Sequence, residues 1–517
     1  MIMKKNILIS LLAICGLLTA CNLDTNPTTS VTSDNVYKST ADADMVLNGT
    51  IHNLFNEGQT YSSLGYRAIL NAYDAMGSDV AVDVNKYGFK SSYQFTGIYG
   101  KGQINSISWS IAYHTINNCN NVIANIDNTE GQDSEKNRIK GQAFALRGFS
   151  YLQLASTYSF AINKDSSAVC APIYTQPTDE TIANQGHPAA SVNEVYNRSI
   201  SDLEEALTLI PEGYARSEKY NIDQQVVLGL LSRACLYARQ WDKAKNYSDQ
   251  LLSLNNYLMS ESEYKSGFND ASNNEWIWGY PQTKDDNLPS YNFYFLDTTT
   301  PGSYYCSFNA DPYFKDLFND GDYRKDLLNW GINPNLSSSS APYIYMHNSK
   351  FKFKDVQAQM ADIVLMRVSE IYLINAEAKA RLNDNSGALE SLNTLRKARG
   401  SKEAVGLSGQ ALLDQIWLER RKELWGEGFS LIDIIRNQQA VARTSLPLNT
   451  TVAISYTEDG TITSRDVPAS GHTTVQFPDQ SNFTANSKYY LFRIPDSEES
   501  TNKHIYDKHP KLSIYAQ

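Results

Sequence analysis

Residues 362–382, DIVLMRVSEIYLINAEAKARL, carry apolar side chains on two faces at helical spacing. One face holds Leu365, Val368, Tyr372 and Ala376 with Lys379, and the other holds Ile371, Ile374 and Ala378. A helix that is apolar on two faces packs between two neighbours, as the helices of a solenoid do. The segment therefore predicts one helix over 362–382 that is sandwiched within a stack of helices.

The segment that follows, from Asn383 to Leu395, starts with a polar turn and continues with Gly387-Ala388-Leu389. Residues 239–244, RQWDKA, have a similar form, in which a small Ala lets two helices approach closely. Both segments are typical of the second helix of a tetratricopeptide-type repeat, although the strict consensus is absent. Several such pairs in one chain predict a mainly α fold built on tetratricopeptide-like helical repeats.

Helical periodicity also extends over the following segments: 40–57, 105–128, 134–158, 223–239 and 242–254. Ser191 and Glu194 have the spacing of a capping box, so a further helix is expected to begin there. We expect the helical repeats at about these positions: 105–158, 191–254, 362–399 and 409–440.

Three stretches are loop-rich and interrupt the helical pattern, at about 59–104, 256–355 and 443–490. Short strand-like runs occur within the last two, at Glu275–Tyr280, Tyr291–Leu296, Tyr343–Met346, Thr451–Tyr456 and Thr473–Phe477. Insertions of this kind on a rigid scaffold are where binding surfaces usually lie. We therefore expect the loop-rich insertions to form the ligand-binding half of one domain, residues 34–517.

The N-terminus has the form of an export signal. Lys4 and Lys5 precede an apolar stretch, residues 7–18, that is too short to span a bilayer. The stretch ends in Leu18-Thr19-Ala20-Cys21. This is compatible with an ordinary signal peptide cut after Ala20, but it fits better a bacterial lipobox, in which the Cys thiol is acylated.

The lipobox interpretation predicts a lipoprotein. Residues 1–20 are then the signal peptide, Cys21 is the lipidated N-terminus, and residues 21–33 form a flexible tether. Two or more acyl chains anchor a protein stably to a membrane. We expect a folded body tethered to a bilayer through Cys21.

Composition narrows the function classes. The chain has 517 residues, 42% hydrophobic and 20% charged, which excludes a mostly disordered protein. Its formal net charge of -11 disfavours phosphate backbones, so no nucleic-acid partner is expected. Beyond the N-terminus no run is apolar enough to enter a bilayer, which excludes a polytopic membrane protein.

Cysteine and histidine patterns predict neither a metal site nor a cofactor. Four cysteines lie far apart and form no CxxC pair: Cys119, Cys170, Cys235 and Cys306. They allow three disulfide connectivities, and we favour none as essential. The seven histidines lack ligand spacing.

No enzyme signature is present. The sequence has no HExxH, GxSxG or P-loop motif. A pair of distant carboxylates of a glycoside hydrolase is a remote alternative. The charged residues near Glu370, Glu377, Arg396 and Arg399 are better explained by ion pairs between helices, and the cluster from Glu419 to Glu427 by a structural network.

Aromatic residues crowd the loop-rich segments and are the stronger functional indication. One set alternates through Tyr87, Phe89, Tyr93, Phe95 and Tyr99, and a second set includes Trp276, Trp278, Tyr280, Tyr291, Phe293, Tyr294, Phe295, Tyr304 and Tyr305. Flat rings with a polar edge suit the apolar faces and hydroxyl groups of sugars. We expect about two thirds of these rings to be core, and the rest to be available to a ligand.

Several motifs together resemble the SusD/RagB family of nutrient-binding outer-membrane lipoproteins of Bacteroidetes. The matching segments are Cys21–Pro27, Ala145–Tyr151 (ALRGFSY), Val364–Ala378 (VLMRVSEIYLINAEA), Glu419–Gly428 (ERRKELWGEG) with Asp433 and Arg436, and Leu491–Pro495 (LFRIP) with 498–502. Arg493 departs from the family pattern, which has Pro there. The resemblance covers nearly the whole chain.

The resemblance implies about four tetratricopeptide-like helix pairs and a lipid-anchored protein on the exterior of the cell outer membrane. It further implies capture of oligosaccharides, without chemistry, for delivery to a TonB-dependent, SusC-like outer-membrane transporter. Some members of the family capture peptides instead, and that alternative stays open. The starch-binding member of the family binds sugars on an arc of aromatic residues. In a loose alignment this arc falls near Tyr93, Tyr294 and Tyr304 of the present chain, and Tyr305 is adjacent in sequence. The resemblance therefore implies an aromatic platform at these four residues.

Overall fold

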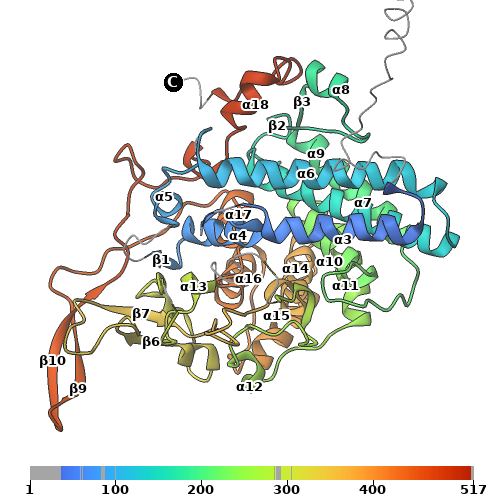
Figure 1. The fold of residues 1–517 in the computed structure, drawn as a ribbon. Coiled ribbons are helices and arrows are strands. Elements are labelled where there is room, and N and C mark those ends of the chain that lie inside the picture. The colour runs from blue at the N-terminus through green and yellow to red at the C-terminus, as the bar shows by residue number, and fades with distance from the viewer. Residues whose placement is uncertain are drawn as a thin grey trace, which may run out of the picture.

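The computed structural model describes residues 36–513, apart from 59, 61, 83–87, 99, 284–285, 287–292 and 304 and the side chains of Glu180 and Tyr294. The predicted signal peptide, lipobox and tether lie outside the described residues. Within the described part, two layers of helices form a scaffold that carries a loop-rich half with short strands (Figure 1). The predicted mainly α architecture is confirmed.

The first layer consists of long helices that lie side by side (Figure 1): α3 (Thr40–Asn56), α4 (Gly65–Ala75), α6 (Gln103–Asn125), α7 (Asp133–Thr157) and α9 (Val192–Leu209). The predicted capping box begins α9, where Ser191 Oγ accepts from the Glu194 N–H and the Glu194 carboxylate accepts from the Ser191 N–H. Small residues let these helices pack closely, as Gly148 of α7 does against Leu203 and Ser199 of α9.

The second layer is a stack of helix pairs: α10 (Gln224–Tyr237), α11 (Trp241–Leu254), α14 (Val368–Arg381), α15 (Asn385–Ala398), α16 (Gly409–Glu423) and α17 (Ser430–Arg436). Helix α14 packs on α11 and on α15. Ile371 and Ile374 belong to the main hydrophobic core, whereas Leu373 and Ala376 belong to a smaller core shared with α15 and α16. Burial on two faces of this helix is confirmed.

The start of the predicted helix 362–382 is wrong. Residues Ile363–Arg367 form strand β8, which pairs antiparallel with β4 (Trp276–Tyr280), and the helix begins only at Val368. β-branched Ile363 and Val364 favour an extended backbone. The pairing partner lies more than 80 residues away in sequence, so the local pattern could not show that a strand would form.

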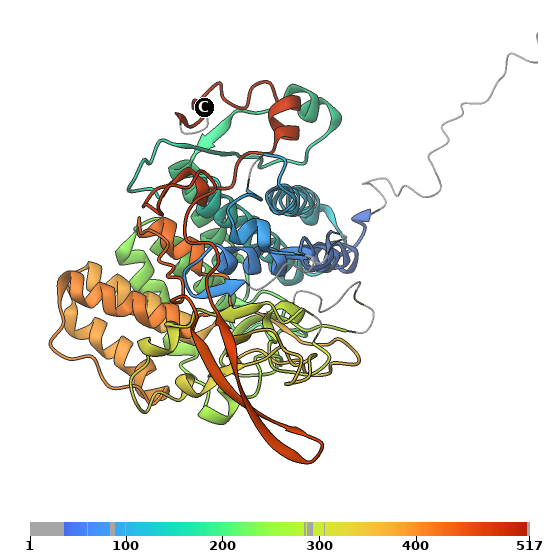
Figure 2. The same ribbon diagram turned by 90° about the vertical axis from the view of Figure 1, so that its left-hand side faces the viewer.

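Small sheets lie in two places on the molecule. The loop-rich half holds the pair β1 (Val80–Val82) with β5 (Phe308–Ala310) and a four-stranded sheet of the order β6 (Leu328–Gly331), β7 (Ile344–Asn348), β10 (Thr461–Ser470), β9 (Thr451–Glu458), whereas the pair β2 (Val169–Pro172) with β3 (Ala189–Ser191) packs on α9. The connections between the longer elements contain short helices: α5 (Lys90–Tyr93), α8 (Glu180–Gln185), α12 (Glu261–Tyr264), α13 (Phe293–Leu296) and α18 (Asp496–Thr501), with 3₁₀ turns at 126–128, 314–317, 323–327 and 488–490. The β9–β10 hairpin extends away from the body in both views (Figures 1 and 2).

Three of the predicted strands are confirmed, at 275–280, 343–346 and 451–456. The one at Tyr291–Leu296 is wrong, because Phe293–Leu296 forms a helical turn, and residues 291–292 lie outside the description. Short apolar runs do not distinguish a strand from a buried helical turn. The one at Thr473–Phe477 is also wrong, since the Thr473 N–H donates to the Tyr93 hydroxyl rather than to a neighbouring strand.

All four described cysteines are free and buried. Burial raises the pKa of the Cys119, Cys235 and Cys306 thiols to about 12, so they stay protonated at neutral pH. Among the described residues no helix has the length and apolar character needed to cross a membrane.

The close approach of α7 and α9 predicts a position-specific cost. A Cβ at Gly148 would lie 2.9 Å from Leu203 Cγ and 3.0 Å from the Ser199 carbonyl oxygen. We expect Gly148→Val to lower the free energy of unfolding by about 2–3 kcal/mol through overpacking. Urea denaturation measures this, with Gly49→Val as the matched control: Gly49 lies inside α3 with open space around it, so its change should stay within about 0.5 kcal/mol. Equal losses in both variants would contradict the packing argument.

Candidate functional site

Tyr93, the first residue of the predicted platform, lies at the end of α5 with only 2% of its surface exposed. Its hydroxyl is 2.9 Å from His472 Nδ1 and accepts from the Thr473 N–H at 3.1 Å. The Arg443 guanidinium lies over the ring, 4.2 Å from its centroid. Tyr93 therefore ties the first loop-rich insertion to the last one, and ligand contact by its ring stays a prediction.

Tyr305 is also largely covered, with 7% exposed, and its ring stacks on Phe295 at a centroid distance of 4.7 Å. Tyr304 and the side chain of Tyr294 lie outside the described residues, so their place in the platform stays a prediction. The expectation that most of the loop aromatics are core agrees with Trp276, Trp278 and Phe293, which are buried.

The two aromatic segments meet in space although about 200 residues separate them. Phe89 packs edge-on against Phe295 and Phe308, with centroids 4.9 and 5.2 Å apart. Strand β1 pairs with β5 directly beside these rings. The cluster holds the first and second insertions against each other, and the platform itself stays a prediction.

A polar cluster at the C-terminal end of α3 was not predicted from the sequence. Tyr280 donates its hydroxyl to Asp286 Oδ1 at 3.0 Å and accepts from Asn56 Nδ2 at 3.2 Å. His52 Nδ1 lies 3.1 Å from the same hydroxyl, and the His52 side chain is 50% exposed. The Tyr280 ring stacks on Phe55 at 4.2 Å. An exposed imidazole and a half-buried amide beside a fixed ring can form hydrogen bonds with the hydroxyl groups of a ligand.

No local signal pointed to this cluster, because more than 200 residues separate α3 from Tyr280 and Asp286. His52 and Asn56 occupy the polar side of an ordinary amphipathic helix. Only the docking of the second insertion against α3 brings the groups together.

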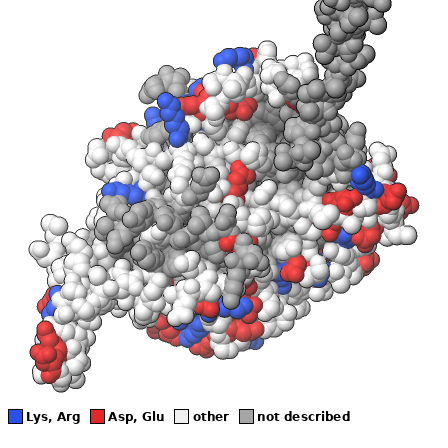
Figure 3. Space-filling model, in the orientation of Figure 1, with Lys and Arg blue, Asp and Glu red and all other residues white. Residues whose placement is uncertain are grey.

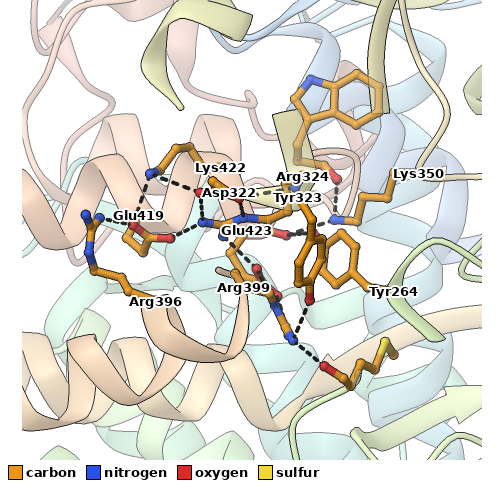
Figure 4. A network of polar contacts seen from close by, with 12 residues as sticks. Tyr264, Asp322, Tyr323, Arg324, Lys350, Arg396, Arg399, Glu419, Lys422 and Glu423 are labelled. Atoms are coloured by element: carbon orange, nitrogen blue, oxygen red, sulfur yellow. Dashed lines mark hydrogen bonds and ion pairs between the residues drawn. The ribbon is translucent and has the colours of Figure 1, made fainter. Parts of the chain in front are cut away.

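A buried network of ion pairs attaches the second insertion to the helical scaffold (Figure 4). Glu423 of α16 accepts from three guanidinium groups: Arg324 at 2.8 Å, Arg367 at 3.0 Å and Arg399 at 2.9 Å. Arg324 also contacts Asp322 at 2.7 Å and Glu419 at 2.5 Å. Arg324 belongs to the insertion, Arg367 to β8 and Arg399 to the end of α15, so one carboxylate joins three segments.

The network continues through Glu275 and Glu427. Arg399 donates to both carboxylate oxygens of Glu275, at 3.0 and 2.9 Å, and Arg367 donates to Glu275 as well. Lys350 Nζ donates to Glu427 at 2.6 Å and to the Trp425 carbonyl oxygen at 2.8 Å. Glu275 and Lys350 are insertion residues, and both side chains are buried.

Electrostatics in this network keeps the acids ionised. Burial alone would raise the pKa of Glu419, but Arg324, Lys422 and Arg396 lower it to about 2. Against the same burial, Arg399, Arg367 and Arg324 hold the pKa of Glu423 well below its usual range. Such satisfied, permanently charged groups are structural rather than acid–base catalysts.

The expectation of interhelical ion pairs is confirmed. The acids of α14 pair with arginines of helices that lie far away in the sequence. Glu370 pairs with Arg233 of α10 at 2.6 Å, and Glu377 pairs with Arg436 of α17 at 2.8 Å. Arg396 pairs with Glu419 at 2.5 Å. Each acid pairs with a helix that the fold brings beside it, which sequence spacing does not specify.

Two surface observations bear on the ligand. On the face drawn in Figure 3, Lys and Arg are interspersed with Asp and Glu and much of the surface is uncharged. Within the described part of the chain, no group of three or more His, Cys, Asp or Glu side chains is arranged to hold a metal ion.

The network predicts a pH-dependent stability. We expect Glu419→Gln to lower the free energy of unfolding at pH 7 by about 3–5 kcal/mol, because it leaves Arg396 buried without its counter-charge and removes one of the three carboxylates around Arg324. The folded pKa of Glu419 is about 2 and its ordinary value is 4.5. Its ionised form therefore stabilises the fold above pH 4.5, and this contribution is lost as pH falls towards 2.

Urea denaturation at pH 7 and at successively lower pH measures the free energy of unfolding of the wild type and of Glu419→Gln. The difference between the two free energies should become smaller below pH 4.5. The exposed Glu390 of α15 provides the matched control, since Glu390→Gln removes a carboxylate that is not part of this network. A Glu419→Gln variant as stable as Glu390→Gln at pH 7 would contradict the role assigned to the network.

Comparison with known proteins gives consistent matches. Residues 332–510 match the family model described as the SusD family, and residues 25–236 match one described as "Starch-binding associating with outer membrane". A SusD-like protein of Formosa agariphila is 22% identical over 387 residues, which is 65% of this chain and 73% of the relative.

Solved structures extend the match to the whole fold. A SusD-like carbohydrate binding protein from Bacteroides vulgatus is 59% identical, with a TM-score of 0.90, and the alignment covers 93% of this chain and 100% of that one. A putative sugar binding protein from the same organism is 23% identical, with a TM-score of 0.73 over 91% of this chain and 98% of its own. The second likeness concerns the fold alone.

Proposed function

The chain belongs to the SusD family, and we propose that it is a glycan-binding lipoprotein that captures oligosaccharides at the cell surface. The observation that carries the proposal is the 59% identity, over 93% of the chain, to a SusD-like carbohydrate binding protein. At that identity the loop-rich half is matched together with the scaffold, so a ligand of the same class is the simplest expectation.

The proposed role is binding without turnover. Glu419 and Glu423 are ionised and paired with several cations within the structural network, which leaves them unsuited to general acid catalysis. We place the ligand on the loop-rich half, at the platform of Tyr93, Tyr294, Tyr304 and Tyr305, and we propose the exposed His52 and the half-buried Asn56 as further candidate polar contacts.

Delivery of the ligand requires a pore, because a tethered body cannot import anything by itself. We propose a TonB-dependent, SusC-like barrel in the outer membrane as the partner, with this protein anchored beside it through Cys21 on the exterior. The match to a family described as associating with the outer membrane supports this location. Sharing one membrane raises the effective concentration of the two partners, so their contact need not be strong.

A glycan array probed with the purified protein tests the capture of oligosaccharides. We expect binding to at least one oligosaccharide class, with no product released over hours of incubation. If the protein binds only to a peptide panel tested in parallel, the proposed ligand becomes a peptide, and formation of a product would overturn the proposal that the protein binds without turnover.

For an oligosaccharide that binds on the array, we expect Tyr304→Ala to weaken binding by about 1–3 kcal/mol in calorimetry, because the variant loses the stacking of the ring on the sugar.

The matched control is Tyr257→Ala, which truncates an exposed tyrosine of the same loop-rich half. That variant should bind like the wild type. Equal affinity of wild type and Tyr304→Ala would remove Tyr304 from the platform while leaving capture by another part of the loops.

The anchor is tested separately. We expect Cys21→Ala to release the protein from the membrane fraction, because the acylated thiol is lost while the folded domain begins well after it. Immunoblots of membrane and soluble fractions after a carbonate wash measure this, and Ser33→Ala in the tether serves as the control. A Cys21→Ala variant that still pellets with membranes would contradict the lipid anchor.

A further inference from the structure

A hollow of about 260 Å³ lies on the helical scaffold, between α16, α17 and the segments 78–80 and 437–442. Residues that line it include Trp417, Arg420, Phe429, Asp433 and Ala440. None of the tyrosines of the predicted platform is among the lining residues. The hollow is therefore separate from the loop-rich site proposed above.

Part of its wall is aromatic and held in place. Trp425 donates its Nε1–H to the Asp79 carbonyl oxygen at 2.9 Å, which fixes that ring. The Arg420 guanidinium lies 5.6 Å from the centroid of Phe429. Trp417 is half-buried and completes a wall of three rings at the hollow. Such walls suit the apolar face of a sugar ring.

Two side chains at this wall carry hydrogen-bond donors that have no partner among the described residues. Arg420 is 1% exposed and donates its Nε–H to Asp433 at 2.9 Å, but its Nη1 and Nη2 make no hydrogen bond. Trp417 Nε1 likewise has none. Buried donors are nearly always satisfied in folded proteins. These nitrogens are themselves covered, so a ligand or water in the hollow supplies the acceptors after a small shift of the two side chains towards it, which the cost of leaving buried donors unpaired favours.

The charges around the hollow decide what kind of acceptor fits. Asp74, Asp79, Asp414 and Asp433 also line it. Burial raises the pKa of Asp74 to about 7, so this group is partly neutral at pH 7. The other three would repel an anion, although Arg421 pairs with Asp79. A hydroxyl group can accept from Arg420 and donate to a carboxylate, so it satisfies both kinds of neighbour. The volume is below the roughly 300–1,000 Å³ of pockets for larger ligands.

We propose that this hollow is a second binding site, on the helical scaffold, for a single neutral sugar ring. It would hold a monosaccharide or the terminal residue of a glycan, independently of the loop-rich platform.

The test uses one variant that fills the hollow with an added side chain and one that removes an aromatic ring from its wall. Ala440 is exposed and lines it, so Ala440→Trp occludes the space without removing a polar partner. Trp417→Leu removes one aromatic ring and its N–H donor but keeps an apolar side chain at this position. Ala41→Trp, at an exposed position in the first turn of α3, is the matched control for the added ring.

The probes are the methyl glycosides of glucose, galactose, mannose, xylose and fucose, with glucuronate and glucose 6-phosphate as anionic counterparts. Saturation-transfer NMR and tryptophan fluorescence follow binding to the full chain. We expect at least one neutral glycoside to bind with an affinity weakened tenfold or more in Ala440→Trp and in Trp417→Leu. Ala41→Trp and Tyr304→Ala should bind it like the wild type.

Three outcomes would overturn the proposal: no neutral glycoside binds, only the anionic probes bind, or binding survives unchanged in Ala440→Trp. Loss of monosaccharide binding in Tyr304→Ala with retention in Ala440→Trp would assign it to the loop-rich platform and leave the hollow without a role. Conversely, failure of the glycan array with long oligosaccharides would overturn the function proposed above without affecting the site on the scaffold.

Discussion

The Glu423 carboxylate, buried among the guanidinium groups of Arg324, Arg367 and Arg399, is the interaction on which the arrangement of the two halves depends. Each arginine comes from a different segment: the loop-rich insertion, strand β8 and the end of α15. An isolated buried carboxylate would be unstable, and so would each arginine. The segments are therefore stable only in the one arrangement that brings all of these charges together.

The same requirement explains how a large loop-rich insertion can lie on the scaffold in a defined place. Loops have little regular hydrogen bonding of their own, so their position must come from side-chain contacts. The contacts to the helical scaffold are made by four buried, charged residues of the insertion: Glu275, Asp322, Arg324 and Lys350. The rings of Phe89, Phe295 and Phe308 supply them between the first two insertions. A rigid base of this kind lets the surface loops vary with the ligand.

The charged residues that hold the fold together are different residues from those proposed to bind a ligand. Glu419 and Glu423, whose pKa values lie well below their usual range, belong to the buried network, where each has several cationic partners. The groups proposed to meet a sugar are of another kind: loop tyrosines, the exposed His52 with the half-buried Asn56, and the unpaired donors of Arg420 and Trp417. Such groups form hydrogen bonds and ring contacts, which is what reversible capture requires.

The sequence by itself determined the helices, the family and the nature of the charged clusters. Periodicity defined α3, α6, α7 and α14 because a helix buries residues three and four positions apart, and the motif around Glu419–Gly428 identified the family because its charges are needed for the fold. Local patterns could not show that 363–367 is a strand, since its partner β4 lies far away in sequence. Nor could they show that Tyr93 is covered by Arg443 and His472, or that His52 meets Asp286. Those outcomes depend on contacts between distant segments, and only the tertiary structure decides which of many possible partners a side chain meets.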